Sequence, residues 1–192
     1  MSAPTPKPTC LKVFSENIPE QLTSLPQWVV WRLEWVFGKN GKPGRWTKKP
    51  YQVPADEPDE KDNPKAKPAE LEPLVLGSSI DPTTWTAFGK ALEFSQIDNR
   101  VDGIGFVFTE AAGIIGVDLD KCVAEDGSVD EWALEVVRRF NSFTELSPSG
   151  TGLHIFSRGH IPMTGAKRGH VEIYRQSRFF TVTGHLLDEV RT

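Results

Sequence analysis

Three short segments of this chain each place one ionisable side chain between two aliphatic ones: 117–119 (VDL), 153–155 (LHI) and 171–173 (VEI). Side chains alternate between the two faces of a β-strand, so each segment can bury its aliphatic residues and present Asp118, His154 or Glu172 on the opposite face. The chain is therefore predicted to contain a sheet with one apolar face and one face that gathers ionisable groups. The alternative is that each of these polar residues simply faces solvent.

The remaining elements predicted from the sequence complete a mainly antiparallel α+β domain. Aliphatic and aromatic runs predict strands at 28–35, 104–109, 114–120, 143–146, 153–156, 171–174 and 179–183. The strands at 104–109 and 114–120 are separated by four residues, which favours a hairpin. A helix is predicted to start at Asp81-Pro82 and to end near Phe94, and a second helix is predicted from about 130 to 140.

Length and charge indicate how the chain is organised. Its 192 residues, 38% of them hydrophobic, fit one domain with a sizeable core. The net charge of −4 comes from 54–73, which holds seven acidic residues, three basic residues and five prolines. We predict a solvated insertion loop at 54–77, a flexible tail at 1–20 in which Leu11, Val13 and Phe14 dock locally, and one globular domain at 21–192.

Several classes of protein are disfavoured by the sequence. Cys10 and Cys122 form no CxxC pair, which argues against a zinc knuckle or a disulfide framework. No apolar run approaches the ~18 residues of a spanning helix, and the N-terminal residues lack the apolar segment of a signal peptide. We therefore expect a cytoplasmic protein without a membrane partner. The absence of a GxxxxGK[ST] motif excludes a P-loop ATPase site in this chain.

Asp118 and Asp120 form the first candidate site. On a strand they share one face, with Cα atoms about 6.6 Å apart. Two carboxylates at that spacing repel each other unless a cation lies between them, and Mg²⁺ or Mn²⁺ suits oxygen ligands of this kind. The alternative is that the pair faces water or caps a turn.

Anion-binding features surround this site in the sequence. The turn at 147–152 (SPSGTG) can aim backbone N–H groups and hydroxyls at a phosphate, although an ordinary hairpin turn has the same composition. Basic residues cluster at 39–49 and 158–178, with Trp46 or Tyr51 available to stack on a base. Solvated loops are the alternative for these clusters, and a surface ion pair is the alternative for Arg178.

Taken together and in this order, the segments 117–120 (VDLD), 147–156 (SPSGTGLHIF) and 171–184 (VEIYRQSRFFTVTG) resemble the three catalytic motifs of the archaeo-eukaryotic primase superfamily. The similarity is closest to the primase-polymerase domains of replication proteins from phages, plasmids and integrated elements. Upstream segments at 27–34, 47–51, 78–85 and 103–109 resemble the same group. The resemblance implies an RRM-like, mainly antiparallel sheet that carries the active site, flanked by a smaller N-terminal α/β portion.

The resemblance also implies a function and roles for residues. The chain would be a nucleotidyltransferase that synthesises or extends primers on a single-stranded DNA template, using (deoxy)nucleoside triphosphates and two divalent ions, Mg²⁺ or Mn²⁺. Asp118, Asp120 and Glu172 would be the metal ligands, and His154 would join them in catalysis. The nucleotide would be bound by Ser147, Ser149, Gly150, Gly152, His154, Arg178, Phe179 and Lys49, with Phe179 near the 2′ position of the sugar unless it belongs to the core.

Template and primer are expected to bind the remaining basic residues, which are Lys39, Lys42, Arg45, Lys48, Lys167 and Arg168. A helicase or ATPase module is expected in the same longer chain or operon. Two other functions stay open: a catalytically silent nucleic-acid-binding module for replication initiation, and a metal-dependent nuclease or phosphohydrolase that uses the same carboxylates.

Overall fold

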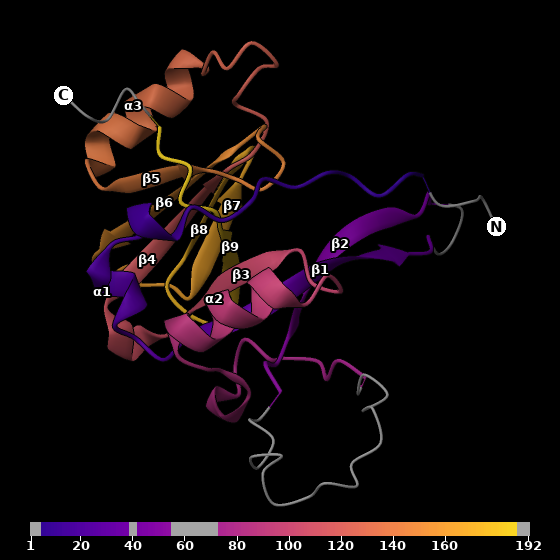
Figure 1. Cartoon of the computed structure of the whole chain (residues 1–192). Coiled ribbons are helices and arrows are strands. Elements are labelled where there is room, and N and C mark those ends of the chain that lie inside the picture. Colours follow the sequence, from indigo (N-terminus) through magenta and orange to yellow (C-terminus); the bar gives the residue numbers. More distant parts are fainter. Residues whose placement is uncertain (1–4, 39–41, 55–72, 188–192) are drawn as a thin grey trace, which may run out of the picture.

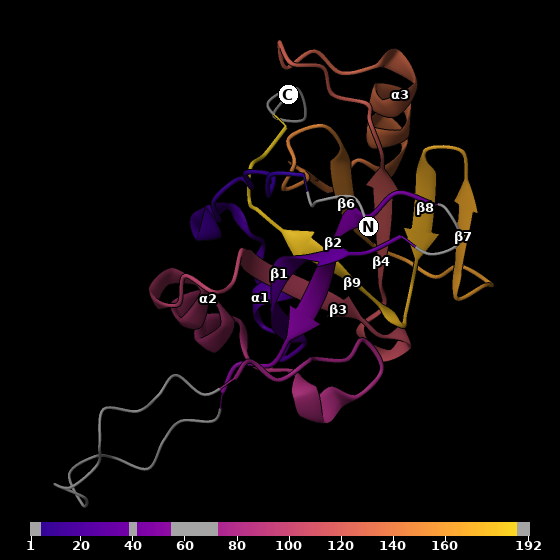
Figure 2. The ribbon, with the colours of Figure 1, turned by 90° about the vertical axis from the view of Figure 1, so that its right-hand side faces the viewer.

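A computed structural model describes residues 5–38, 42–54 and 73–187, which fold into an α+β arrangement of two antiparallel sheets and few helices (Figures 1 and 2). Sheet A has the strand order β2-β1-β3-β9, with β1 at Trp28–Val36, β2 at Arg45–Tyr51, β3 at Gly103–Phe108 and β9 at Arg178–Val182. Sheet B has the order β5-β6-β4-β8-β7, with β4 at Ile114–Leu119, β5 at Phe143–Leu146, β6 at Leu153–Arg158, β7 at Gly165–Arg168 and β8 at Val171–Tyr174.

Each sheet is covered by one of the longer helices. Helix α2 (Phe88–Ile97) packs on β1 and β3 of sheet A, where the ring of Phe88 meets that of Trp28 at 4.9 Å. Helix α3 (Glu131–Phe140) covers sheet B and buries Ala133, Leu134 and Val137. A shorter helix, α1 (Glu20–Thr23), and three 3₁₀ turns at Ser15–Asn17, Pro82–Thr84 and Glu110–Ala112 complete the described elements.

A cluster of aromatic rings joins the two sheets. Phe106 and Phe108 of β3 and Phe180 of β9 lie against Phe156 of β6, with ring centroids 5.7 to 6.3 Å from that of Phe156. All four side chains are at most 7% exposed. Burial of this aromatic area gives the interface between the sheets its main stabilisation, about 1.5–3 kcal/mol for each fully buried ring.

The predicted hairpin between 104–109 and 114–120 is wrong. Both segments are strands, but β3 pairs with β1 and β9 in sheet A, whereas β4 pairs with β6 and β8 in sheet B. The 3₁₀ turn at Glu110–Ala112, capped by the Thr109 hydroxyl, carries the chain from one sheet to the other. Every residue of β3 is buried, as in a central strand with neighbours on both sides.

The helix predicted from Asp81 to Phe94 begins later than expected. Asp81 caps only a 3₁₀ turn, and Trp85 is extended. Thr86 then exchanges two backbone hydrogen bonds with Trp28, of 2.8 and 3.0 Å, and this bridge ties the segment to sheet A before α2 starts at Phe88. The sequence signal for a helix start at Asp81-Pro82 was therefore outweighed by the pairing of Thr86 with Trp28.

Two strands were not predicted, and both lie at sheet edges. β2 occupies the segment that was interpreted as a basic loop, and β7 lies next to β8. Lysines and a proline suit an edge strand, because they discourage pairing with another chain, but they conceal the strand in the sequence. Sheet A is also not purely N-terminal: its strand β9 comes from the C-terminal part of the chain.

Residues of the predicted N-terminal tail contact the body of the domain. The backbone N–H of Leu11 donates to Pro148 O at 2.9 Å, that of Phe14 donates to Thr183 O at 2.7 Å, and Val13 packs against the core. The expected local docking is therefore observed, and the domain boundary at residue 20 stays a prediction. Of the predicted insertion loop, 55–72 lies outside the described residues, and 75–77 pairs with the end of β2.

None of the helices in the described ranges is long and apolar enough to cross a membrane.

Candidate active site

A row of five ionisable side chains crosses one face of sheet B. Asp118 on β4 lies opposite His154 of β6 on one side and opposite Glu172 of β8 on the other. The row continues to Glu145 on β5, opposite His154, and to Lys167 on β7, opposite Glu172. Residues paired across neighbouring strands share a face of the sheet. The prediction that Asp118, His154 and Glu172 face one side of one sheet is therefore confirmed.

A cavity of about 220 Å³ lies where this row meets sheet A. Sheet B contributes Asp118, His154, Glu172 and Tyr174, and sheet A contributes Lys48, Arg178, Phe179, Phe180 and Thr181. The two sheets thus bring carboxylates from sheet B and cations from sheet A into the lining of one cavity, and Lys48 comes from a part of the chain far from the other charged residues. Among the predicted nucleotide-binding residues, His154, Arg178 and Phe179 line it.

Asp118 is held in an environment that disfavours its negative charge. Its side chain is 26% exposed, and burial together with the neighbouring carboxylate of Asp120 raises its pKa to about 6. The ammonium of Lys48 acts in the opposite direction and does not fully compensate. A further positive charge at this point would relieve the unfavourable environment of the carboxylate.

His154 is buried and flanked by two acidic side chains. Its Nε2 atom lies 3.8 Å from Oδ1 of Asp118, and its Nδ1 atom lies 3.4 Å from Oε1 of Glu145. Burial, assisted by the charge of Lys48, lowers the pKa of the imidazole to about 3, so the ring is neutral at pH 7. The ring therefore offers a hydrogen bond to the cavity and no charge.

Glu145 was missed by the sequence analysis. Its side chain is fully buried and accepts hydrogen bonds from the backbone N–H groups of Thr183 (3.0 Å) and Gly184 (2.7 Å). Burial raises its pKa to about 8, against the effect of these hydrogen bonds. Glu145 thus links the ring of His154 to the backbone just after β9. An acidic residue within a short strand (FTEL) was the one available signal.

Glu172 is paired with a cation from the edge strand. Burial alone would raise the pKa of Glu172, but hydrogen bonds from the Lys167 ammonium and from the Tyr174 hydroxyl (2.8 Å) lower it below its ordinary value. The Lys167 ammonium also lies 3.9 Å from Oδ2 of Asp120. One positive charge therefore stands between two of the three predicted metal ligands.

The donors fit a divalent cation by their chemistry. Carboxylate oxygens are the ligands that Mg²⁺ and Mn²⁺ prefer, and a cation would relieve the burial and the repulsion from Asp120 that together raise the pKa of Asp118. As the side chains stand, however, no three His, Cys, Asp or Glu side chains of the described chain form a metal-binding group. Asp120 and Glu172 face Lys167 instead. The ligand roles of the three carboxylates stay a prediction.

The positions expected for Lys48 and Lys49 are exchanged in the structure. Lys49 was expected at the nucleotide, but its Nζ atom lies 2.6 Å from Oε2 of Glu34, on the other face of β2. Lys48 was expected to contact DNA, but it lines the cavity with Asp118. Neighbouring residues of a strand point to opposite faces, so only one of the two lysines can reach the carboxylates.

The glycine-containing turn lies beside Asp120 and does not line the cavity with Asp118. Its hydroxyls hydrogen-bond one another, with 3.1 Å between Ser147 and Ser149. Gly150 has a φ of +72°, and a Cβ atom at Gly152 would lie 2.6 Å from the carbonyl oxygen of Leu119, so glycine is required at this contact. Phosphate binding by Ser147, Ser149, Gly150 and Gly152 stays a prediction.

The predicted DNA-binding residues do not form one surface. Lys42 and Arg45 are exposed at the end of the β1–β2 pair where the chain passes from one strand to the other, and Arg168 is exposed on β7. Lys48 and Lys167 belong to the candidate active site, and Lys39 lies outside the described residues.

The aromatic residues proposed for base stacking are also engaged. Tyr51 is 4% exposed and donates its hydroxyl hydrogen bond to Glu34, so it has no free face for a base. Trp46 is half-buried against Trp35, with ring centroids 5.6 Å apart, and donates to Thr5 O.

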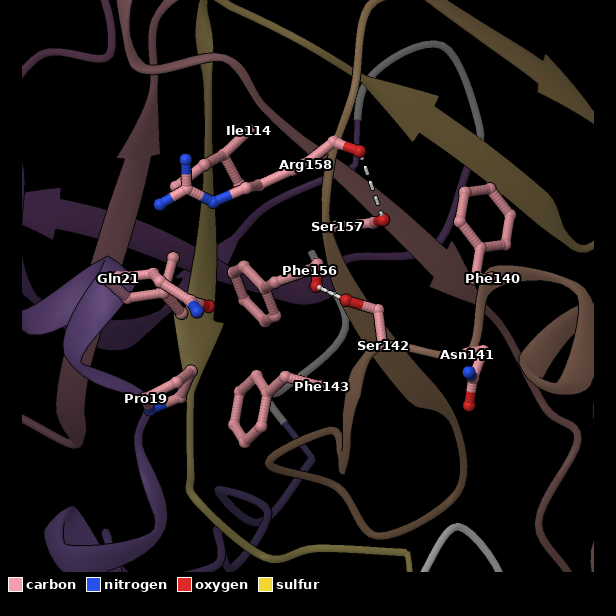
Figure 3. A pocket seen from close by; sticks show the side chains of 11 residues that line it. Pro19, Gln21, Ile114, Phe140, Asn141, Ser142, Phe143, Phe156, Ser157 and Arg158 are labelled. Carbon is pink, nitrogen blue, oxygen red and sulfur yellow. Dashed lines mark hydrogen bonds between the residues drawn. The ribbon is translucent and has the colours of Figure 1, made fainter.

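A second cavity, of about 260 Å³, has a different chemistry (Figure 3). Its walls include the rings of Phe140, Phe143 and Phe156, and Arg158 is its one ionisable lining residue. Ser142 closes one side by donating a hydrogen bond of 2.6 Å to Phe156 O. With no carboxylate in its lining, this cavity offers no ligand set for a divalent cation.

Comparison with known proteins places a phage protein among the relatives of this chain. The sequence matches no family model. A DNA primase-polymerase from Nitratiruptor phage NrS-1 is 31% identical over 175 residues, which cover 87% of this chain and 20% of the relative. The chain thus spans about a fifth of the length of that protein.

Proposed function

The relationship to a phage primase-polymerase supports the assignment of this chain to a primase-polymerase domain family, and on that premise we propose that it catalyses template-directed nucleotidyl transfer. It would synthesise or extend primers during replication of a phage, plasmid or integrated element. One observation carries the proposal: Asp118 is flanked in register by His154 and Glu172, in a cavity whose other wall supplies Lys48 and Arg178.

We propose that Asp118, Asp120 and Glu172 hold the divalent ions. Bound there, such ions would supply the positive charge that activates the primer 3′-hydroxyl and stabilises the leaving pyrophosphate. The proposal is supported by the unfavourable burial of the Asp118 carboxylate and by its register with Glu172. Binding of the ions requires that the ammonium of Lys167 leave Glu172 and Asp120.

The other residues of the cavity would position the nucleotide. His154, neutral at pH 7, would hydrogen-bond to a phosphate oxygen, and the guanidinium of Arg178 would compensate negative charge that develops during transfer. Arg178 is held over the ring of Tyr174 at 4.9 Å. Catalysis would then consist of positioning and electrostatic stabilisation, without a covalent intermediate.

Phe179 would select the sugar. It lines the cavity next to Arg178, while Phe180 and Val182 belong to the main core. We expect Phe179→Ala to reduce the discrimination between ribo- and deoxynucleotides in a primer-extension assay. Unchanged discrimination would end this part of the proposal.

Sheet B would be the RRM-like sheet of the archaeo-eukaryotic primase fold. The succession β4, α3, β5 and β6 supports this, because it matches the first four elements of a βαββαβ unit. A departure lies between β6 and β8, where the described chain has the edge strand β7 in place of a second helix.

The substrates would be single-stranded template, primer and nucleoside triphosphates. Because this chain covers about a fifth of its relative, we also propose that a helicase or ATPase module accompanies the domain in a longer chain or operon.

The test is extension of a labelled primer–template with Mg²⁺ or Mn²⁺, with and without nucleotides. We expect extension by the wild type and by Asp126→Ala, a control in an exposed turn, and none by Asp118→Ala or Asp120→Ala. Extension by Asp120→Ala would refute the site. Shortening of the primer would indicate a nuclease, and DNA binding indifferent to metal and to Asp118→Ala would indicate a silent binding module.

A further inference from the structure

Lys48 is a cation without an anionic partner in the described part of the chain. Its Nζ atom lies 3.3 Å from the hydroxyl oxygen of Thr181 and 6.0 Å from the ring of Trp31. An ammonium has three donors, so one neutral acceptor leaves most of its hydrogen-bonding capacity unused. Lys49, the next residue, shows the contrast, because it forms an ion pair of 2.6 Å with Glu34.

The unused capacity of Lys48 faces the cavity of the candidate active site. Lys48 and Arg178 of sheet A line this cavity together with Asp118 and Glu172 of sheet B. A ligand in the cavity would meet both the cations and the carboxylates, together with any ion that the carboxylates hold. A polyphosphate chain has the charge for both contacts, because its oxygens bind ammonium groups and divalent cations alike.

The size and position of the cavity favour a nucleotide over a DNA backbone. Lys48 is half-buried, in a cavity of about 220 Å³, whereas a DNA strand follows open basic surface. The exposed cations Lys42 and Arg45, at the other end of the same strand pair, are better placed for a strand of DNA.

We propose that Lys48 binds the triphosphate of the incoming nucleotide, and that sheet A thereby completes an active site whose carboxylates all belong to sheet B. This inference rests on the proposed nucleotidyltransferase function. This role depends on the packing of the two sheets, because Lys48 and Asp118 line one cavity only when β2 and β4 both face it.

The test compares two adjacent lysines that point in opposite directions. Lys48→Met and Lys49→Met keep most of the apolar stem of the side chain and remove the charge. Binding of a fluorescent, non-hydrolysable deoxynucleoside triphosphate is measured with Mg²⁺, and binding of labelled primer–template is measured separately by anisotropy. We expect Lys48→Met to weaken nucleotide binding by about tenfold or more, with DNA binding unchanged, because a charge-assisted hydrogen bond is lost. Lys49→Met should change neither, and Lys48→Arg should restore most of the nucleotide affinity.

A measurement on the wild type keeps the inference testable if Lys48→Met does not fold. Nucleotide with Mg²⁺ should protect Lys48, but not Lys49, from an amine-reactive reagent, as read by mass spectrometry. The inference is overturned by nucleotide affinity of Lys48→Met within twofold of wild type, by loss of DNA affinity alone, or by equal protection of both lysines. If the wild type binds nucleotide through Lys48 but does not extend primers, the proposed function fails and the binding role stands.

Discussion

Two clusters of charged side chains lie on opposite faces of the β1–β2 pair, and they differ in how far their charges are satisfied. In the outer cluster, Glu34 accepts hydrogen bonds from Arg32 and Tyr51 and pairs with Lys49. The hydrogen bonds from Lys49, Tyr51 and Arg32 lower the pKa of Glu34 to about 2. This carboxylate is stabilised as an anion by partners that belong to the chain itself.

In the inner cluster, the active-site cavity, the pKa shifts of Asp118 and Lys48 run the other way, whereas Glu172, which pairs with Lys167, keeps a lowered pKa. Burial raises the pKa of Asp118 to about 6 and lowers the pKa of Lys48, so both charged forms are disfavoured. A closed network stabilises a strand pair, whereas groups kept in unfavourable charge states retain the capacity to bind a ligand. This difference is the one expected if the outer cluster is structural and the inner cluster, as proposed, binds a ligand.

The largest effect is expected from Asp118→Asn, which keeps the shape of the side chain and removes its charge. This substitution tests whether Asp118 serves the reaction or only the fold. We expect primer extension to fall by at least about two orders of magnitude. Stability should not fall, and at pH 8 it should rise. The folded-state pKa of Asp118 lies above its ordinary value, so the carboxylate costs stability as the pH rises from about 4 to 6 and above.

Thermal unfolding at pH 5 and pH 8, with Asp126→Asn as a matched control in an exposed turn, measures the stability effect. A loss of stability at pH 8 comparable to that of a broken ion pair would place Asp118 with the structural cluster.

The second prediction concerns Glu145, the buried member of the row. Glu145→Ala leaves the N–H groups of Thr183 and Gly184 without their acceptor, and each such loss costs about 1–3 kcal/mol. We expect a decrease of several kcal/mol in the free energy of unfolding, measured with urea. Glu145→Gln retains one acceptor oxygen and should lose less; equal losses for the two variants would show that the acceptor is not what matters.

The sequence predicted that Asp118, His154 and Glu172, the three central members of the row, share a face, because the signal for this is local. Alternation within 117–119, 153–155 and 171–173 decides which side chains share a face, and the pairing of β6, β4 and β8 then aligns them. Strand partners are not local. The segments 104–109 and 114–120 have the composition and spacing of a hairpin, and only the rest of the chain assigns them to different sheets.

The same limit explains the exchange of Lys48 and Lys49. Once 45–51 is known to be a strand, alternation places Lys49 with Tyr51 on one face and Lys48 on the other. The basic residues and Pro50 are more typical of a solvated loop than of a strand, so the sequence alone does not assign either lysine to a face of a sheet. The role of Glu145 is harder still to predict from the sequence. Its hydrogen-bond partners are backbone groups of 183–184, which no pattern of side chains reveals.

The third prediction tests whether the outer cluster is structural. Glu34→Gln should lower the free energy of unfolding by about 1 kcal/mol at pH 7, because a partly exposed ion-pair network contributes little more than that. Since its folded-state pKa is lowered, the contribution of Glu34 is complete above its ordinary pKa near 4.5 and is lost as the pH falls towards 2. The difference in stability between wild type and variant should therefore shrink in acid. Primer extension at neutral pH should be unchanged, and a large loss of extension would connect Glu34 to the active site.

The smallest expected effect is on stability, where substitution of Lys48 and substitution of Lys49 should differ in sign. Lys49→Met removes an exposed ion pair and should lower the free energy of unfolding only slightly. Lys48→Met removes an ammonium that burial disfavours, as the lowered pKa of Lys48 indicates, so its stability should be equal to or above that of the wild type. Paired urea titrations at pH 7 resolve the two signs, and a clear loss for Lys48→Met would mean that the lysine stabilises the fold by neutralising the carboxylates opposite. A stability gain combined with weakened nucleotide binding is the result expected of a side chain that is held in place for a ligand.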